Sequence, residues 1–260
     1  MKWMLPVFFM MIVLSAFTQP TFQLAPPLLS YQSSFFSGST SLEVQFNQPG
    51  AKVYYTIDGS EPSEKDKIYT GPVSIRKKTT IKARAIGKEF LPSATVTASF
   101  IPAGKIITEV SFTAPNESYA HAQAGILHDG IGGIDNYRHG SWLGYNNDTA
   151  TFEILLEKKE TVREVLVSML RDKNSWIFLP EQVKLFAFNE ASQTFQFIAS
   201  ESFSHSAPTS KQVDMHLLKL KKKVSTNRLK VVVTPLRKIP DWHSGKGEHG
   251  WFFVDEIKVY

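Results

Sequence analysis

The sequence predicts an all-β protein, an immunoglobulin-like β-sandwich followed by a second β-sandwich of the jelly-roll type. Short runs rich in β-branched and aromatic residues recur along the chain, and loops rich in glycine and asparagine separate them. Helical periodicity is scarce, so the strands must supply the cores. A length of 260 residues favours two domains once a leader segment is removed.

The first 18 residues have the features of a secretory signal. Lys2 provides a positive start, residues 3–16 form an apolar run, and Ala16-Phe17-Thr18 is an acceptable cleavage site. The alternative is an uncleaved membrane anchor, but this run is shorter than the ~20 apolar residues that span a bilayer. We therefore expect an exported chain that is periplasmic, cell-surface or secreted, with no membrane span after cleavage.

Composition excludes several classes of function. The chain has no cysteine, which excludes disulfides, a thiolate nucleophile, a lipoprotein anchor and a cysteine-type zinc site. Lys and Arg exceed Asp and Glu by five, and the densest basic run is Lys219–Lys223. A nucleic-acid site needs a basic face with aromatic residues or a recognisable motif, and neither is present. The lysine run is typical of a protected strand edge.

The first predicted domain covers residues 29–102, after a polar lead-in at 19–28. Alternating side chains over residues 53–57 and 81–85 indicate half-buried strands. Residues 58–62 place glycine and proline where a tight turn requires them. We expect a small antiparallel sandwich there.

The second predicted domain covers residues 103–260 and contains the most informative loop of the chain. Residues 127–145 combine five glycines with acidic, amide and ring-bearing side chains. Such a segment is too rich in glycine for a helix or a regular strand. Loops of this kind on a rigid scaffold concentrate binding residues, so the chemistry indicated is recognition rather than turnover.

Residues 29–102 resemble the chitobiase/β-hexosaminidase C-terminal domain, a small β-sandwich. The resemblance rests on a YYT-DG-x-x-P turn followed by a tyrosine, a proline and a T-I-K-A strand. The matching residues are Tyr54 to Thr56, Asp58, Gly59, Pro62, Tyr69, Pro72 and Thr80 to Ala83.

Residues 103–260 resemble a discoidin-type (coagulation factor type C), galactose-binding-like module. The motifs are an L-x-DG loop, a D-Y-x-x-G-x-W-x-G-[FY] segment in which Asn136 replaces the acid, an S-W-I-F-x-P segment and a final E-I-x-V-Y strand. The matching residues are Leu127, Asp129, Gly130, Tyr137, Gly140, Trp142, Gly144, Tyr145, Ser175 to Phe178, Pro180, Glu256, Ile257, Val259 and Tyr260. The same two modules follow one another at the C-terminus of bacterial family-20 β-N-acetylhexosaminidases.

The resemblance implies non-catalytic binding of a glycan containing hexosamine or galactose. The hexosaminidase barrel needs ~250 residues, and no such length remains. Asp255-Glu256 is the only candidate for the catalytic acid pair, and it lies in the last strand of a β module. No HExxH or G-x-S-x-G motif is present. The alternatives are an adaptor that docks a partner protein such as a glycosidase, an accessory tail, or an enzyme remnant without a ligand.

A structural calcium ion is the predicted cofactor. Calcium takes six to eight oxygen ligands from flexible loops. Asp129 and Asp135 lie among glycines, and Glu256 joins them in the discoidin resemblance; Asn136 or a backbone oxygen is an alternative to Asp135. The other interpretation is that these acids cap turns by accepting backbone N–H groups.

Sugar recognition requires an aromatic platform and donors of fixed geometry. The candidate contacts are Tyr137, Arg138, Trp142, Arg171, Asn174, Trp176 and Trp251, with Trp242 and His243 as further candidates. Trp142 lies in a loop between Ser141 and Leu143 and is the preferred platform. Trp176 and Trp251 begin segments that also look like core strands, and Arg171 could form a surface pair with Asp172.

Overall fold

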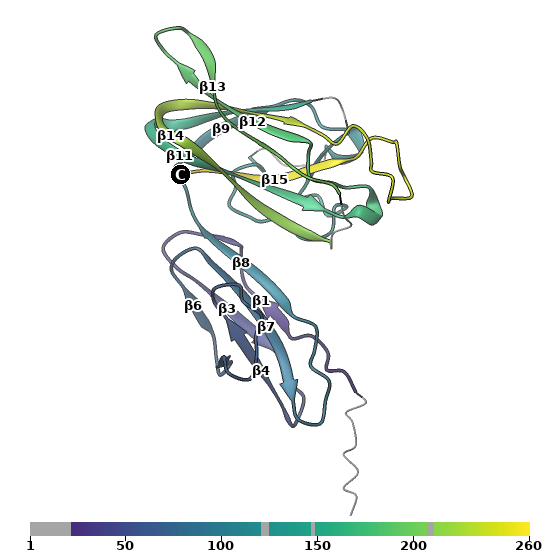
Figure 1. Cartoon of the computed structure of the whole chain (residues 1–260). Helices are drawn as coiled ribbons and strands as arrows, with labels where there is room; N and C mark the ends of the chain where they lie inside the picture. The colour runs from purple at the N-terminus through teal and green to yellow at the C-terminus, as the bar shows by residue number, and fades with distance from the viewer. Residues whose placement is uncertain (1–21, 121–124, 147–148, 207–210) are drawn as a thin grey trace, which may run out of the picture. The chain divides into compact units, whose positions relative to one another are not determined.

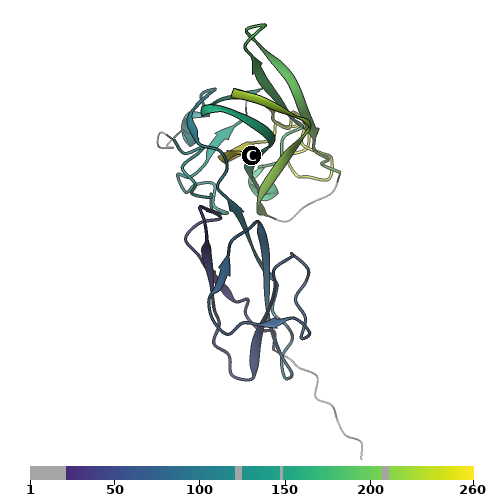
Figure 2. The same ribbon diagram turned by 90° about the vertical axis from the view of Figure 1, so that its left-hand side faces the viewer.

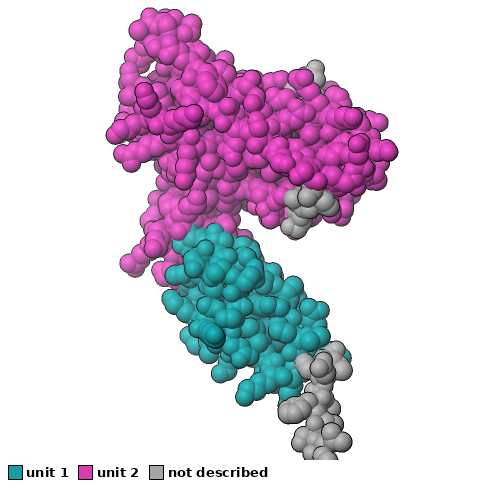
Figure 3. All heavy atoms as spheres, viewed as in Figure 1, with its two compact units in different colours: residues 1–30, 42–73, 79–98 teal, residues 31–41, 74–78, 99–260 magenta. Residues whose placement is uncertain are grey.

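The computed structural model describes residues 22–120, 125–146, 149–206 and 211–260. It divides into two compact units (Figure 3). The first holds the described residues among 1–30, 42–73 and 79–98, and the second holds the described residues among 31–41, 74–78 and 99–260. The predicted signal at 1–18 and the start of the lead-in lie outside the described residues. The predicted domain limits stay predictions, since the units interleave along the chain.

The described residues before position 103 form two sheets, as expected from their alternating pattern. Their strands are β1 (Leu28–Ser30), β2 (Phe35–Phe36), β3 (Thr40–Gln45), β4 (Ala51–Thr56), β5 (Lys67–Ile68), β6 (Val73–Ile75), β7 (Thr79–Gly87) and β8 (Val96–Pro102). One sheet has the order β1-β3-β6 and the other β2-β8-β7-β4-β5. In β7, Ile81, Ala83 and Ala85 are fully buried, which is the period-two pattern of a strand with one core face.

The remaining strands form a second β structure. They are β9 (Ile107–Phe112), β10 (Leu143–Tyr145), β11 (Ala150–Arg171), β12 (Gln182–Asn189), β13 (Thr194–Ser202), β14 (Gln212–Thr234) and β15 (Phe252–Val259) (Figure 1). Two single turns of 3-10 helix, η1 (Glu117–Tyr119) and η2 (Lys173–Ser175), are the helical elements of the described residues. No helix in this described part of the chain is long and apolar enough to span a membrane. The all-β prediction is confirmed.

Two long strands, β11 and β14, contribute to both layers of this sandwich. Residues 150–156 of β11 pair with β9 and with the end of β14, which in turn pairs with β12. After register shifts between Leu155 and Glu164, residues 165–170 pair with β15. One buried cluster contains side chains from both halves, so the core lies between the layers.

The last strand, β15, is buried along its whole length between β10 and β11. Its register against β11 shifts between Glu256 and Val254, so Asp255 is an extra, bulged residue. Val254 and Ile257 face the main core. Consequently the acids Asp255 and Glu256 both point away from that core, toward the loop at 127–133.

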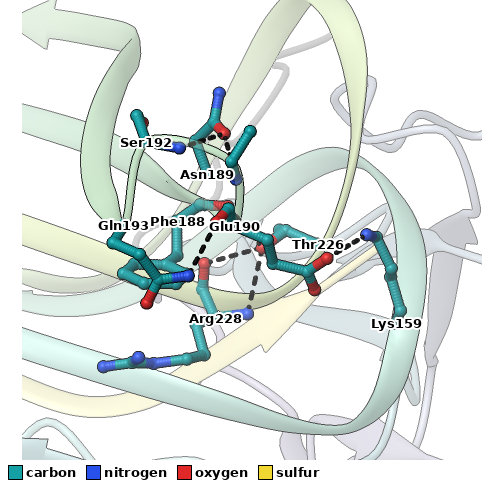
Figure 4. Close-up of polar contacts among 9 residues, drawn as sticks. Lys159, Phe188, Asn189, Glu190, Ser192, Gln193, Thr226 and Arg228 are labelled. Carbon is teal, nitrogen blue, oxygen red and sulfur yellow. Dashed lines mark hydrogen bonds and ion pairs between the residues drawn. The ribbon is translucent and has the colours of Figure 1, made fainter.

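The hairpin of β12 and β13 extends beyond the neighbouring strands in Figure 1 and in Figure 2. Figure 4 shows how its turn end is held. The Thr226 hydroxyl lies 3.3 Å from the Phe188 carbonyl oxygen and 3.0 Å from the Arg228 carbonyl oxygen, and it accepts from the Arg228 amide at 3.1 Å. The Lys159 Nζ of β11 lies 2.9 Å from Oε2 of Glu190, which is in the turn between β12 and β13.

We expect Thr226→Val to lower the free energy of unfolding by ~1–2 kcal/mol, because the buried hydroxyl serves two strands and valine leaves its partners unpaired. Urea unfolding followed by circular dichroism measures this change. The neighbouring exposed Ser225 is the matched control, and Ser225→Ala should stay within ~0.5 kcal/mol of wild type. Equal stabilities of the two variants would contradict this role.

Candidate functional site

Trp176 is an exposed tryptophan held in a strained backbone conformation. Its φ of 60° and ψ of 24° lie in the left-handed region, where a bulky side chain is rare. Its amide donates to the Lys173 carbonyl at 2.9 Å and closes the η2 turn. The side chain is 38% exposed, although tryptophan is usually highly buried. Strained backbone of this kind concentrates at functional positions.

The ring of Trp176 is supported from behind by the loop at 240–247. A methyl group built on Gly245 would lie 2.8 Å from Cε2 of Trp176, so only glycine allows this close packing. The His243 ring meets the indole edge-on at 6.4 Å. His243 is itself fixed, because its Nε2 donates to the Lys173 carbonyl at 2.8 Å and its Nδ1 accepts from the Gly245 amide at 3.0 Å. Trp176 is therefore rigid on one side and open on the other.

A second aromatic group lies next to Trp176. The Trp251 amide donates to the Trp176 carbonyl at 2.8 Å, which places the two residues on adjacent backbone segments. Tyr119 packs edge-on against Trp251 at 5.1 Å and against Tyr137 at 6.0 Å. Phe253 lies beneath them, 4.8 Å from Tyr119. Three of these rings, Tyr119, Tyr137 and Trp251, are partly exposed.

Polar donors surround these rings. Arg138 is exposed, with Nε 3.2 Å from the Tyr137 hydroxyl and its guanidinium 5.4 Å from the centre of the Tyr137 ring. Asn174 is exposed in the η2 turn, two residues before Trp176. Five of the seven predicted contacts, Tyr137, Arg138, Asn174, Trp176 and Trp251, lie on three segments linked by backbone and ring contacts. The Trp176 ring packs on His243 and Gly245, whereas Trp251 and Tyr137 pack around Tyr119. We call these five predicted contacts, with Tyr119, the aromatic surface.

The preferred platform, Trp142, has a different role. Its side chain is only 2% exposed, its Nε1 donates to the Ile134 carbonyl at 2.8 Å, and it packs with Leu170, Ile177 and Phe253. A ligand cannot reach this ring, so Trp142 is a core residue. Trp142 stabilises the loop through its hydrogen bond to Ile134, and the chain after Trp142 enters the buried strand β10.

Arg171 is also occupied within the protein. Its guanidinium contacts both oxygens of Asp214, at 3.0 Å and 3.2 Å, and neither side chain is more than one-fifth exposed. The alternative pair with Asp172 is not formed. Asp172 is buried and instead accepts from the Ser175 hydroxyl at 3.0 Å, with the Lys211 ammonium at 3.5 Å. This contact fixes the η2 turn that carries Trp176.

Trp242 fixes the neighbouring loop. Its Nε1 donates to the His205 carbonyl at 2.8 Å, and Phe178 lies edge-on to both His205 and Trp242. Burial lowers the pKa of the His205 imidazole, and the Pro180 carbonyl opposes this effect. Trp242 and His205 are therefore structural neighbours of the aromatic surface rather than parts of it.

The predicted calcium ligands do not form a cage of carboxylates. Asp129 accepts from the Ile131 amide at 2.7 Å and so caps its own turn, while Asp135 is exposed. Glu256 is fully buried, accepts from the Gly130 amide at 3.1 Å, and has the Lys258 ammonium at 2.5 Å. Within the described ranges, no group of three or more His, Asp or Glu side chains is placed to hold a metal ion. The described side chains do not by themselves form the predicted site.

The acids of β15 are buried rather than open to a substrate. Burial raises the pKa of Asp255 and that of Glu256, and the Lys258 ammonium, paired with Glu256, opposes the second shift. Asp255 accepts from the Gly133 amide. Both carboxyl groups therefore serve the loop at 127–133.

Two residues of the surface were not foreseen from the sequence. Tyr119 lies at the end of η1, in a segment without a motif, and only its packing between Tyr137 and Trp251 reveals it. Gly245 lies in the stretch HSGKG, where glycine usually indicates a turn. Its contact with Trp176 cannot be inferred from spacing, because 69 residues separate the two.

Comparison with protein families gives one match. The family model described as Fn3 associated matches residues 42–100. The match lies inside the region where the sequence resembles the chitobiase C-terminal domain, and it ends before strand β9. No curated protein matches the chain in sequence.

Solved structures similar to the chain include a pectin-binding carbohydrate-binding module, at 13% identity and a TM-score of 0.37, covering 60% of this chain and 91% of that one. A CBM32 module from Clostridium perfringens in complex with GalNAc-β-1,3-galactose has 14% identity and a TM-score of 0.37. The match covers 58% of this chain and 94% of that module. A two-domain protein from Bacteroides fragilis has 10% identity and a TM-score of 0.39. The match covers 90% of this chain and 94% of that protein. Pectin and GalNAc-β-1,3-galactose are ligands of those two modules.

We expect acid to weaken the support beside the aromatic surface. Because the pKa of folded His205 lies below the ordinary value of 6.5, its contribution to stability is present above pH 6.5 and is lost as pH falls below it. Thermal unfolding across this range should show a smaller loss of stability for His205→Gln than for wild type. The exposed His249 is the control, and His249→Gln should follow wild type. Identical pH dependence of wild type and His205→Gln would contradict this account.

Proposed function

We propose that this protein binds carbohydrate without catalysis, through the aromatic surface, and that its ligand is a glycan containing hexosamine or galactose. The observation that carries the proposal is Trp176, an exposed indole in a left-handed backbone conformation with one side packed on Gly245. An exposed, rigid aromatic side chain offers contact area at a low cost in conformational entropy.

The shape of the surface suits a sugar ring. The indole of Trp176 presents a flat apolar face to the C–H groups of a pyranose, and Trp251 and Tyr137 add partly exposed ring area on the segments next to it. Because the indole is already held by His243 and Gly245, little rotamer freedom remains to be lost on binding.

The polar groups of the surface suit hydroxyl and amide groups. Arg138 carries donors in a fixed fork, and Asn174 offers a donor and an acceptor together. Both are exposed at loop positions rather than paired inside the fold. A neutral sugar can meet these groups without bringing a charge into the site. We expect weak affinity for a single sugar, since a shallow polar ligand gains little after desolvation.

The proposed setting is outside the cytoplasm, where the predicted signal at residues 1–18 would deliver the chain. The resemblance to modules that follow hexosaminidase barrels supports a hexosamine-containing ligand and an accessory role beside a glycosidase. Under this proposal the first unit acts as a spacer, and the second unit carries the aromatic surface.

A second candidate function is docking of a partner protein, and the hairpin of β12 and β13 favours it. Phe186 faces Phe197 at 5.8 Å and Phe188 faces Phe195 at 5.4 Å, while their neighbours Leu185 and Ala187 face the core. Phe197 is 58% exposed. An apolar group on the outer face of a sheet is typical of an interaction surface.

We expect Trp176→Ala to abolish detectable binding on a glycan array, since stacking on one aromatic ring contributes most of the apolar contact. The whole mature chain is used. Phe197→Ala, which removes an exposed aromatic ring from the hairpin, is the matched control and should bind like wild type. Equal binding by Trp176→Ala and wild type would overturn the proposal. If Phe197→Ala lost glycan binding and Trp176→Ala kept it, the result would favour the hairpin of β12 and β13 as the binding site.

We expect Gly245→Ala to weaken glycan binding by about 10-fold while leaving the fold intact, because the added methyl group displaces the Trp176 ring. Calorimetric titration with the glycan that binds best on the array measures the change in affinity. Gly140→Ala is the control, since a methyl group there meets no atom within 4 Å. Unchanged affinity in Gly245→Ala would show that the ring position does not matter.

A further inference from the structure

Lys258 is a lysine whose ammonium is buried among acids. Its side chain is only 10% exposed, and Nζ lies 2.5 Å from Oε1 of the fully buried Glu256. Asp129 and Asp255 interact electrostatically with the Glu256 carboxyl group. Lysine and glutamate are almost never fully buried unless they are paired. The bulge at Asp255 therefore places two acids and one ammonium on the same side of β15, facing the loop that carries Asp129.

This group of charges holds the loop at 127–133 against the last strand. The other oxygen of Glu256 accepts from the Gly130 amide at 3.1 Å, and Asp255 accepts from the Gly133 amide. The Ile257 amide donates to the Leu127 carbonyl at 2.7 Å. Three backbone contacts, at Leu127, Gly130 and Gly133, thus tie the loop to β15. A bound metal at this place would have the same task.

We propose that Lys258 is the built-in cation of this module and replaces the calcium ion that the sequence resemblance implies. Its ammonium occupies the position between Glu256 and the loop, so the connection between loop and strand needs no metal. The inference concerns folding and stands apart from the proposed glycan binding.

The chemistry of the two cations separates the possibilities. Calcium takes six to eight oxygen ligands, whereas an ammonium needs acceptors for three N–H groups. Glu256 already gives one oxygen to Gly130 and the other to Lys258, and Asp129 is committed to its own turn. A calcium ion can enter only if the ammonium of Lys258 leaves, because the two positive charges would compete for Glu256.

The first experiment compares the thermal unfolding of the whole wild-type chain in millimolar calcium and in EDTA, together with terbium luminescence as a probe of calcium-type sites. We expect no shift in melting temperature between the two conditions and no saturable terbium signal. A rise in melting temperature with calcium, accompanied by saturable terbium binding, would overturn the inference. Neither readout requires glycan binding, so failure here is distinct from failure of the proposed function.

The second experiment removes the ammonium. Lys258→Met leaves Glu256 buried without its cation, and the melting temperature should fall by ~10 °C. Lys258→Met/Glu256→Gln removes both charges and should recover part of this loss. Lys246→Met, at an exposed loop position, is the control and should change the melting temperature by less than ~2 °C. A melting temperature of Lys258→Met equal to that of the control would also overturn the inference. If Lys258→Met does not fold, the comparison of the wild-type chain in calcium and in EDTA still tests the inference.

Discussion

The burial of a charged strand is the constraint on which this module depends. β15 is covered along its whole length, yet it carries Asp255, Glu256 and Lys258. Isolated charges in such a place cost far more than a folded domain can tolerate, so each needs a partner. The bulge puts the acids on one side, and the Lys258 ammonium with the Gly130 and Gly133 amides supplies the partners. The loop at 127–133 is ordered as a consequence.

The aromatic surface follows from this order. The ordered loop continues to Tyr137 and Arg138, and Trp142 fills the space beneath it. On the neighbouring segment the buried Asp172 holds the η2 turn, and the turn forces Trp176 into a left-handed conformation. The surface is thus rigid at its base and open at its tips. Such an arrangement favours binding of a ligand over movement of the protein.

The sequence predicted the all-β class well because period-two alternation and turn residues act locally. It also singled out segments that the structure brings next to one another, since exposed loops rich in glycine and aromatic residues are distinct from core strands. It could not rank the tryptophans. Trp142 and Trp176 both follow a serine and both precede apolar residues, and only their exposed fractions in the structure, 2% and 38%, show which ring lies inside. Lys258 occupies the variable position of the E-I-x-V-Y strand, so its pairing with Glu256 was visible only in three dimensions.

The central claim is that a sugar stacks on Trp176, and NMR of the indole N–H groups tests it most directly. Of the five tryptophans, Trp142, Trp176, Trp242 and Trp251 lie beyond the predicted signal, and each gives one resonance, which single substitutions assign. Titration with the ligand identified on the array should shift the resonances of Trp176 and Trp251 and leave those of the enclosed Trp142 and of Trp242 in place. Shifts confined to Trp142 or Trp242, or no shift of Trp176 at saturating ligand, would contradict the account.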